Sequence, residues 1–349
     1  MKNKNLINII LLVSLVFFTT NLLGQESSEN KKIAQTGFQF LTVGTDARAT
    51  SLGEAYTTVE GSSNSLFYNP AGLARLNSFV DISLNRMEWI GDINYLSGTI
   101  GFNLEDGKYG VMGISFSYID YGEFQFTRVA NVDKGYVDID GFSQPYSFSV
   151  GLGYAKELSD KFSVGGQVKY VKQHLGDSYL PVEVFDTLGK SAGWAISEDN
   201  IKNYALGVLA FDFGTLYKTG YKSLTFGMSV RNFAQELTYE KEGFQLPLVF
   251  RIGISMDLMD FYEELKDNHK LLFRLDAAHP RSHPEYIAVG AEYIFMNMVS
   301  LRAGYVTGQD LYDFTAGFGV KQFGVELNYA YTPYIEFSDV HRLSLGFAL

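Results

Sequence analysis

The sequence predicts an all-β fold, a transmembrane antiparallel β-barrel of about fourteen strands with a small N-terminal plug. The segment His341–Leu349 alternates, with Leu343, Leu345 and Phe347 on one face and polar or small residues on the other, which is the period of a β-strand. In water such a strand would be a hazardous sheet edge. In a closed barrel, lipid covers its apolar face and the first strand pairs with the last.

Composition and connection lengths support the same fold class. The chain is 46% hydrophobic and 15% aromatic, and it contains 35 Gly but only 7 Pro. This composition suits strands whose lipid-facing and lumen-facing residues alternate. The connections between the expected strands alternate between short and long along the chain. A β-sandwich would reproduce the strands but not this alternation of connections.

The N-terminus has the plan of a secretory signal peptide. Lys2 and Lys4 precede an apolar run from Leu6 to Phe18, and cleavage is expected near Gly24. The alternative is a membrane anchor, but the run is shorter than the roughly 20 residues that a spanning helix needs. The cleavage region contains no Cys, which excludes a lipoprotein anchor. We therefore expect residues 1–24 to be a signal peptide.

Residues 25–78 do not alternate, and we expect them to form a plug or hatch inside the barrel of residues 79–349; the alternative is a periplasmic arm. Asp46 is placed to cap a helix through Ala55, and Asn69-Pro70 starts a second one. Small side chains allow close packing in a confined space. The residues that we expect to define this plug are Asp46, Arg48, Gly53, Asn69, Pro70 and Gly72.

Fourteen segments of period two, bounded by turn residues, follow the plug. They are Val80–Asn85, Ile93–Leu104, Tyr109–Tyr121, Tyr146–Glu157, Phe162–Gln173, Tyr204–Lys218, Ser223–Phe233, Leu248–Met259, Lys270–His279, Tyr286–Phe295, Val299–Val306, Phe314–Lys321, Gly324–Thr332 and His341–Leu349. In Tyr204–Lys218, Leu209 is out of phase with Leu206 and Val208. A bulge in that strand would reconcile its two halves.

The connection lengths predict the sidedness of the barrel. Tight links such as Glu105–Lys108 are expected in the periplasm, and the long links outside the cell. The turn at Asp106 is therefore expected in the periplasm, and the loop Phe185–Asn200 is expected outside the cell. The long links are Gly122–Pro145, His174–Asn203, Ala234–Pro247 and Pro333–Val340; one periplasmic link, Asp260–His269, is long enough for a helical turn.

With the apolar faces turned to lipid, eight charged side chains point into the lumen. They are Lys169, Arg231, Arg251, Arg274, Asp276, Arg302, Glu326 and Arg342. A plugged lumen must pair such charges, because unpaired buried charge is costly. We expect the plug residues Asp46, Glu54 and Glu60 to be their partners.

The sequence offers little for catalysis. It contains no Cys, which excludes disulfides and thiolate metal sites, and its net charge of −11 argues against nucleic acid. The segment His279–Pro284 is interpreted as an exposed turn, and no nucleophile motif frames any Ser. In the long loop, Asp133, Asp138 and Asp140 do not have EF-hand spacing and are interpreted as solvated charges. We expect no enzyme activity, cofactor or metal.

Five segments of the chain carry a resemblance to known proteins. Three are N-terminal, Phe40–Ala49, Gly53–Ala55 and Leu66–Ala74, the last with an Asn-Pro-Ala motif; two later ones are Phe226–Phe233 and Leu246–Gly253. These segments resemble the PorV/PorQ family, which is related to FadL-type transporters. The resemblance implies a fourteen-stranded FadL-like barrel in the outer membrane of a Gram-negative bacterium, with lipid around it. It further implies a role in type IX secretion, with a translocon or cargo protein as partner.

Two functions stay open at this point. The first is a secretion component that receives or docks exported cargo at the cell surface. The alternative is a FadL-type channel for hydrophobic small molecules, with a lipid or detergent-like ligand in the lumen. Both share the barrel and the hatch, so the sequence does not separate them.

Overall fold

The computed structural model describes residues 36–131, 135–179, 182–185, 187, 189–195, 201–262, 264–308 and 311–349. The expected signal peptide, residues 1–24, and the start of the expected plug, residues 25–35, lie outside these ranges, as does Asp133. The side chains of Asp138 and Asp140 are also outside the description. Among the described residues, no helix has the length and apolar content required to cross a membrane.

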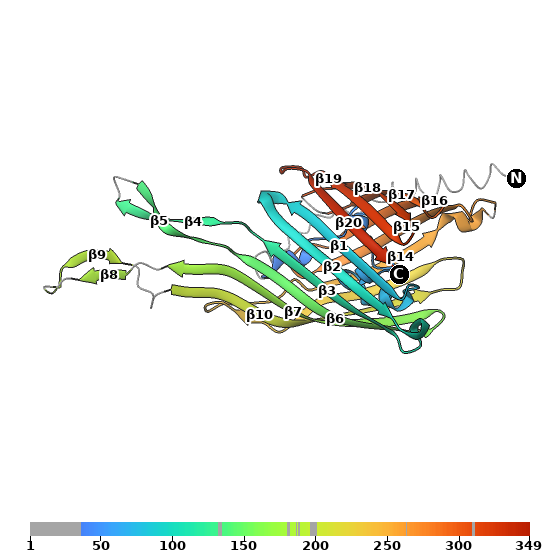
Figure 1. Ribbon diagram of the computed structural model, residues 1–349, viewed down its shortest axis with the longest axis horizontal. Helices are drawn as coiled ribbons and strands as arrows, with labels where there is room; N and C mark the ends of the chain where they lie inside the picture. Colours follow the sequence, from blue (N-terminus) through green and yellow to red (C-terminus); the bar gives the residue numbers. More distant parts are fainter. Residues whose placement is uncertain are drawn as a thin grey trace. The chain divides into compact units, whose positions relative to one another are not determined.

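Fourteen strands form a closed barrel in which neighbouring strands are antiparallel, as predicted (Figure 1). In order around the wall, they are β1 (Val80–Trp89), β2 (Ile93–Asn103), β3 (Val111–Asp120), β6 (Tyr146–Ser159), β7 (Phe162–Tyr179), β10 (Ile201–Lys218), β11 (Thr225–Ala234), β14 (Val249–Asp257), β15 (His269–Pro280), β16 (Tyr286–Phe295), β17 (Val299–Val306), β18 (Phe314–Gln322), β19 (Val325–Thr332) and β20 (Val340–Ala348). The first strand closes on the last, with Leu84 opposite Leu345.

The wall presents apolar side chains outward and polar ones inward. In β20 the side chain of Leu343 is 50% exposed, whereas its neighbour Arg342 is 4% exposed. The same alternation places Val150 and Leu152 of β6 outside and Ser149 inside. Alternation of this kind is what a barrel surrounded by lipid requires.

The phase switch expected within β10 is wrong. From Gly207 onward the strand alternates continuously: Leu209 and Phe211 face outward and Val208 faces inward. Val208 is apolar because it packs inside the barrel, near one end of the lumen. The sequence suggested a change of phase because Val208, although apolar, faces the lumen and not the lipid.

The pairing between β10 and β11 is irregular, and the extra residue lies in β11. Phe211 pairs with Phe233 and Phe213 pairs with Val230, so that two β11 residues, Arg231 and Asn232, lie opposite one residue of β10. This is a β-bulge. Asn232 adopts φ 62°, a left-handed conformation that Asn tolerates better than most residues. Both bulge side chains are buried.

One part of the wall is longer than the rest. β7 and β10 have 18 residues each, whereas β17 and β19 have 8. Ile201 still pairs with Tyr179, so much of the link expected at His174–Asn203 is strand. Three further hairpins occupy the long links: β4 (Phe124–Asn131) with β5 (Gly135–Ser143), β8 (Val182–Phe185) with β9 (Ser191–Ala195), and β12 (Leu237–Thr238) with β13 (Gly243–Phe244). Figure 1 shows the first two hairpins at the same end of the barrel.

A segment inside the barrel, residues 37–76 (the inner segment), runs along the lumen. At one end the Gly37 N–H donates to the Gln245 carbonyl, 3.1 Å away, in the β11–β14 link. At the other end, Arg75 donates to the Asp160 carbonyl in the β6–β7 turn, at 2.8 Å. Its helical elements are short: η2 (Gln39–Thr42), α2 (Ala47–Thr50), η3 (Ser63–Phe67) and η4 (Pro70–Arg75), where η denotes a 3₁₀ helix.

The helix expected from Ala47 to Ala55 ends at Thr50. Gly53 and Glu54 both adopt positive φ, 63° and 62°, which turns the chain against the wall. Within the described ranges, three further 3₁₀ turns lie in the connections between strands: η5 (Ile90–Asp92), η6 (Glu105–Gly107) and η8 (Leu258–Phe261). The last one begins the long link after β14. The helical turn expected in that link is present: the N–H groups of Leu265 and Lys266 donate to the Tyr262 carbonyl at 3.0 and 3.2 Å.

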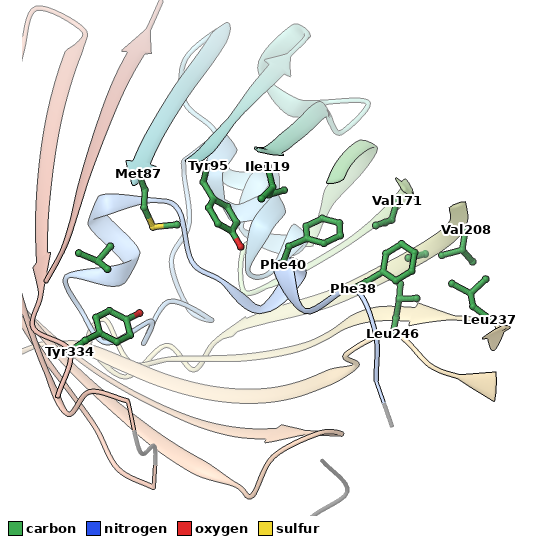
Figure 2. Packing of buried hydrophobic residues seen from close by; sticks show 12 residues of the cluster. Phe38, Phe40, Met87, Tyr95, Ile119, Val171, Val208, Leu237, Leu246 and Tyr334 are labelled. Atoms are coloured by element: carbon green, nitrogen blue, oxygen red, sulfur yellow. The ribbon is translucent and has the colours of Figure 1, made fainter. Parts of the chain in front are cut away.

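An apolar layer fills the lumen near the end that carries the hairpins (Figure 2). Its centre is formed by Phe38 and Phe40 of the inner segment, which are 1% and 6% exposed. Inward side chains of the wall and its links surround them: Met87, Tyr95, Ile119, Val171, Val208, Ala210, Leu237, Leu246, Tyr334 and Val340. This apolar layer packs Phe38 and Phe40 of the inner segment against the wall at one end of the lumen.

Candidate functional site: the interface between inner segment and wall

Asp46 begins α2 and fixes it to β20. Its Oδ1 accepts the Arg48 N–H at 3.0 Å, which is the geometry of an N-cap. The Ser344 hydroxyl of β20 accepts the Ala47 N–H at 2.8 Å. Burial raises the pKa of Asp46, which lies in the inner segment and outside the strands, to about 6. Asp46 therefore acts as a cap, and the expectation that it pairs a wall cation is wrong.

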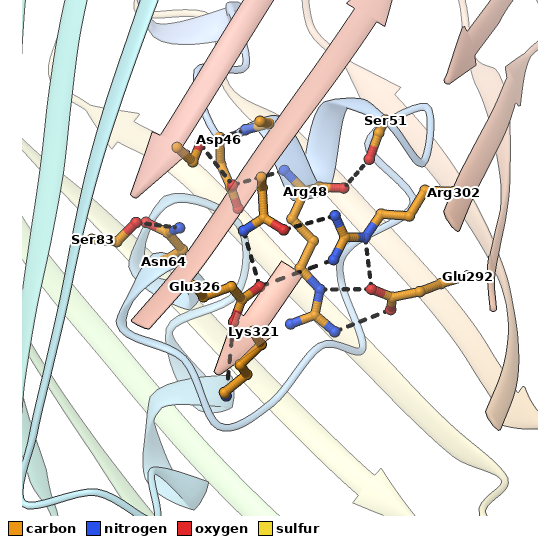
Figure 3. Close-up of polar contacts among 12 residues, drawn as sticks. Asp46, Arg48, Ser51, Asn64, Ser83, Glu292, Arg302, Lys321 and Glu326 are labelled. Carbon is orange, nitrogen blue, oxygen red and sulfur yellow. Dashed lines mark hydrogen bonds and ion pairs between the residues drawn. The ribbon is translucent and has the colours of Figure 1, made fainter. Parts of the chain in front are cut away.

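Arg48 binds a carboxylate of the wall that the sequence analysis missed. Its Nε and Nη2 donate to the two carboxylate oxygens of Glu292 in β16, each at 3.0 Å. Two wall arginines reach the same carboxylate, Arg274 at 2.9 Å and Arg302 at 2.8 Å. Glu292 is fully buried, and Figure 3 shows it between Arg48 and Arg302. Charge-assisted, bidentate pairs of this kind are among the stronger polar contacts in proteins.

Glu54 pairs with a wall cation, as expected. Its Oε2 accepts from Arg251 of β14 at 2.8 Å, and the same guanidinium donates to the Glu54 carbonyl. Next to this pair, the Asp276 carboxylate of β15 accepts the N–H groups of Tyr56 and Thr57 at 3.0 and 2.9 Å. These contacts satisfy backbone donors of the inner segment that would otherwise be unpaired in a buried place.

Glu60 does not pair with any of the eight predicted lumen charges. It forms ion pairs with Arg75 at 3.2 Å and with Lys218 at 2.6 Å. Arg75 also pairs with Glu157 at 3.0 Å. These partners lie where η4 meets the β6–β7 and β10–β11 turns, so they fix the end of the inner segment that leads into β1.

The two predicted glycines lie where the chain comes close to other atoms. Gly53 donates its N–H to the Thr315 hydroxyl at 3.0 Å, and a Cβ on it would lie 3.0 Å from the Val306 side chain. On Gly72, a Cβ would lie 2.6 Å from the Ser65 hydroxyl. Because larger residues do not fit there, the glycines let helical turns pack directly on the wall and on each other.

Asn69 and Pro70 anchor η4. The Asn69 Oδ1 accepts the Ala71 N–H at 3.1 Å, and its Nδ2 donates to the carbonyls of Thr57 and Thr215 at 2.7 and 3.1 Å. One side chain thus caps a helix, holds a second turn and binds β10. Pro70 takes the first helical position, which needs no N–H, and lies against Gly165 of β7.

The β11 bulge is held by a second network that the sequence analysis missed. Lys169 of β7 donates to the Asp212 carboxylate at 2.7 Å and to the Asn232 side-chain oxygen at 2.6 Å. The Asn232 backbone N–H donates to the other Asp212 oxygen at 2.7 Å. Asp212 is 1% exposed. The sequence could have indicated its inward orientation, because Asp212 lies between Phe211 and Phe213, which face outward.

A cavity of about 60 Å³ lies between the inner segment and the wall. Its lining includes apolar residues of the inner segment and the wall, such as Phe40 and Ile119, and polar wall residues, such as Gln167 and Arg231. A buried water needs about 10–15 Å³ on this measure, so the cavity holds a few waters or a small solute. A second one, of about 30 Å³, lies by Asp46 and Glu326.

The histidine cluster at the end of β15 has no neighbours suited to a metal. His279 bonds Glu285 at 2.7 Å, with both side chains mostly exposed. Within the ranges that the structure describes, no group of three or more His, Asp or Glu side chains gathers in metal-binding geometry.

Comparisons with known proteins agree on fold and family. The family described as type IX secretion system protein PorV matches residues 26–271. The toluene transporter TodX of Pseudomonas putida is 11% identical, with a TM-score of 0.53 over 85% of this chain and 95% of that one. A FadL homologue of Pseudomonas aeruginosa is 11% identical, with a TM-score of 0.52 over 87% and 98%. Comparison with curated protein sequences gives no match.

At this level of identity the two solved structures establish the fold, a FadL-like barrel, and not a ligand. The match to the family covers more than half of the chain. Family and fold together place the protein in the outer membrane of a Gram-negative bacterium. The chain belongs to the PorV family of type IX secretion system proteins.

Proposed function

We propose that this protein is an outer-membrane component of type IX secretion that receives or docks exported cargo at the cell surface, with the inner segment as a standing plug. The observation that carries the proposal is the filled lumen. The inner segment binds the wall through Glu292, Arg251 and Asp276, and its two ends bond to the β11–β14 link and to the β6–β7 turn. A barrel filled in this way serves as a platform and not as a conduit for protein.

The cost of moving the inner segment supports this interpretation. Separating Arg48 from Glu292 would take the Arg48 guanidinium away from its counter-charge and leave Glu292 with the two wall arginines alone, and breaking one buried pair typically costs about 3–5 kcal/mol. The apolar layer around Phe38 would have to open as well. Passage of a polypeptide through the lumen would require all of these contacts to break together.

The surfaces that remain for partners are the links at the hairpin end. We assign this end to the outside of the cell, because outer-membrane barrels have short periplasmic turns and long external loops. The β4–β5 hairpin lies in the link between β3 and β6, and the β8–β9 hairpin lies in the link between the long strands β7 and β10. Export by a signal peptide at residues 1–24 is part of the same proposal.

The second candidate is a channel for hydrophobic small molecules. What favours it is the fold shared with a toluene transporter and a FadL homologue. The cavity of about 60 Å³ is too small for a long acyl chain, so the inner segment near Asn69 would have to rearrange for each passage. This requirement makes the channel the weaker candidate.

Two variants separate these functions. The first deletes residues 182–195, the β8–β9 hairpin, and leaves β7 and β10 paired below it. Long links tolerate shortening because closure entropy changes slowly with length, so the barrel should fold. If the hairpin docks cargo, surface proteins should be lost from the cell envelope, as measured by surface proteomics.

The second variant, Asn69→Ala, removes the anchor of η4. A channel should then change its uptake of a hydrophobic compound, while secretion proceeds normally. A normal surface proteome in the hairpin deletion, together with altered uptake in Asn69→Ala, would reverse the choice between the two functions. Heat-modifiable migration of both variants on gels controls for folding.

A further inference from the structure

Two charged side chains, Arg86 and Glu88, lie on the outer face of β1, where a barrel in lipid normally carries apolar residues. Both are exposed, whereas Asn85 and Met87, on the opposite face of the strand, are each 1% exposed. Within the part of the chain that the structure describes, neither charged side chain forms a hydrogen bond or an ion pair, with the other or with any third group. Their surroundings on the outer face therefore decide what they can bind.

The two charges lie where the outer face of the wall changes from apolar to polar. The strand register places Leu343 of β20 and Leu96 of β2 on either side of Arg86, and these leucines are 50% and 46% exposed. Glu88 lies one outward position nearer the hairpin end, opposite Asn94, which is also exposed. On the outer face of a barrel, the end of the apolar band marks the depth at which lipid head groups begin.

The charges follow a fixed order across this boundary. Arg86 is level with the leucines, and Glu88 is about 7 Å further along the strand, from the rise of two residues. Two more carboxylates, those of Asp92 in η5 and Asp339 in the β19–β20 link, are exposed in the connections at the same end. A cation beside the apolar band, followed by carboxylates, complements a head group whose phosphate lies next to the acyl chains and whose ammonium lies beyond it.

We propose that Arg86 and Glu88 bind the phosphoethanolamine head group of a membrane lipid. A guanidinium presents parallel donors that match two phosphate oxygens, and a carboxylate accepts hydrogen bonds from a primary ammonium. The ethanolamine linker spans the step between the two side chains, and the acyl chains lie against Leu343 and Leu96. The inference depends neither on the secretion role nor on which end of the barrel faces outward.

The test measures the unfolding midpoint of the barrel in a nonionic detergent. Phosphatidylethanolamine or phosphatidylglycerol, with short acyl chains of equal length, is added at increasing concentration. A ligand that binds only the folded state raises the midpoint with its concentration. Phosphatidylglycerol has the phosphate but no ammonium, so the midpoint of the wild-type protein should rise more with phosphatidylethanolamine.

Three variants assign the response to residues. Arg86→Gln should lose most of the rise with either lipid, and Glu88→Gln should keep a rise but lose the preference for the ammonium. Lys172→Gln is the matched control and should respond as the wild-type protein does, because Lys172 is a cation on the outer face of β7, 5.8 Å from the centre of the Tyr146 ring. Heat-modifiable migration checks that each variant folds. An equal response of Arg86→Gln and the wild-type protein would overturn the site.

A second pair of lipids distinguishes the two sources of this head group, a glycerophospholipid and a lipid A whose phosphate carries ethanolamine. The wild-type protein is titrated with lipid A that carries phosphoethanolamine and with lipid A that has the bare phosphate. A preference for the ammonium form in only one pair of lipids would support the site and identify that source. The absence of a preference in both pairs would overturn the proposal.

Discussion

The charged residues inside this barrel act at three different contacts. Glu292 collects Arg48, Arg274 and Arg302 around one carboxylate, which gives each arginine a counter-charge within 3.0 Å. Asp46 works as a helix cap. Arg231, in the β11 bulge, binds the Phe67 carbonyl of the inner segment. Residues of similar type thus differ in role because their neighbours differ.

Glu292→Gln should destabilise the folded barrel strongly. The substitution keeps the shape of the side chain but leaves three arginines around a neutral amide, and removing one partner of a buried ion pair costs about 3–5 kcal/mol. The matched control is Glu326→Gln, because Glu326 is partly exposed and lies 3.9 Å from Arg302 and 3.7 Å from Lys321. Its loss should cost less than that of Glu292, because both ion pairs of Glu326 are longer than those of Glu292 and the amide that replaces the carboxylate can still accept from Asn328.

Urea unfolding of both proteins in lipid vesicles, followed by tryptophan fluorescence, measures the difference. Similar midpoints for the two variants would show that the carboxylate of Glu292 does not organise the lumen. A Glu292→Gln barrel that folds but releases the inner segment to added protease would locate the effect in the plug.

The strands are the elements that the sequence predicts best. Alternation is a local property, so the outward set around Val150 and the inward arginines could be read without knowing which strands are neighbours. Glu292 faces the lumen together with Ala288 and Gly290 in β16. Its role could not be predicted, because the sequence does not show that Arg48 lies next to it inside the barrel. The bulge in β11 was missed because it depends on pairing with β10, which a single strand does not encode.

The phase of β20 makes a graded prediction. Leu345 lies near the middle of the strand and Phe347 next to its end, and both face outward between β1 and β19. An arginine on the lipid face costs about 2–4 kcal/mol at the midplane and about 0–1 near the interface. Leu345→Arg should therefore impair insertion into lipid vesicles more than Phe347→Arg. Equal insertion yields for both would be incompatible with this phase and depth.

At the scale of the whole molecule, closure and sidedness come from different kinds of information. Closure was predictable because an even number of strands with one apolar face leaves few other solutions, and the β1–β20 register confirms it. The length of β7 and β10 was not predictable, because their outer ends carry mixed polar residues such as Lys172 and His174. Pairing between the two strands, and not hydrophobic pattern, extends them to Tyr179 and Ile201.

The sidedness yields the last prediction. The loop expected outside, Phe185–Asn200, contains Ser197, which lies outside the described residues, so an exposed site in the β19–β20 link serves better. The chain has no Cys, and both Ser338 in that link and Asp267 in the β14–β15 link are exposed. If the end of the barrel that carries the hairpins faces outward, an impermeant maleimide should label Ser338→Cys in intact cells but not Asp267→Cys at the opposite end, because the membrane blocks the reagent. Both variants should be labelled after the outer membrane is permeabilised, which shows that each thiol is reactive. Labelling of Asp267→Cys alone in intact cells would show that the barrel has the opposite orientation, with the proposed docking surface in the periplasm.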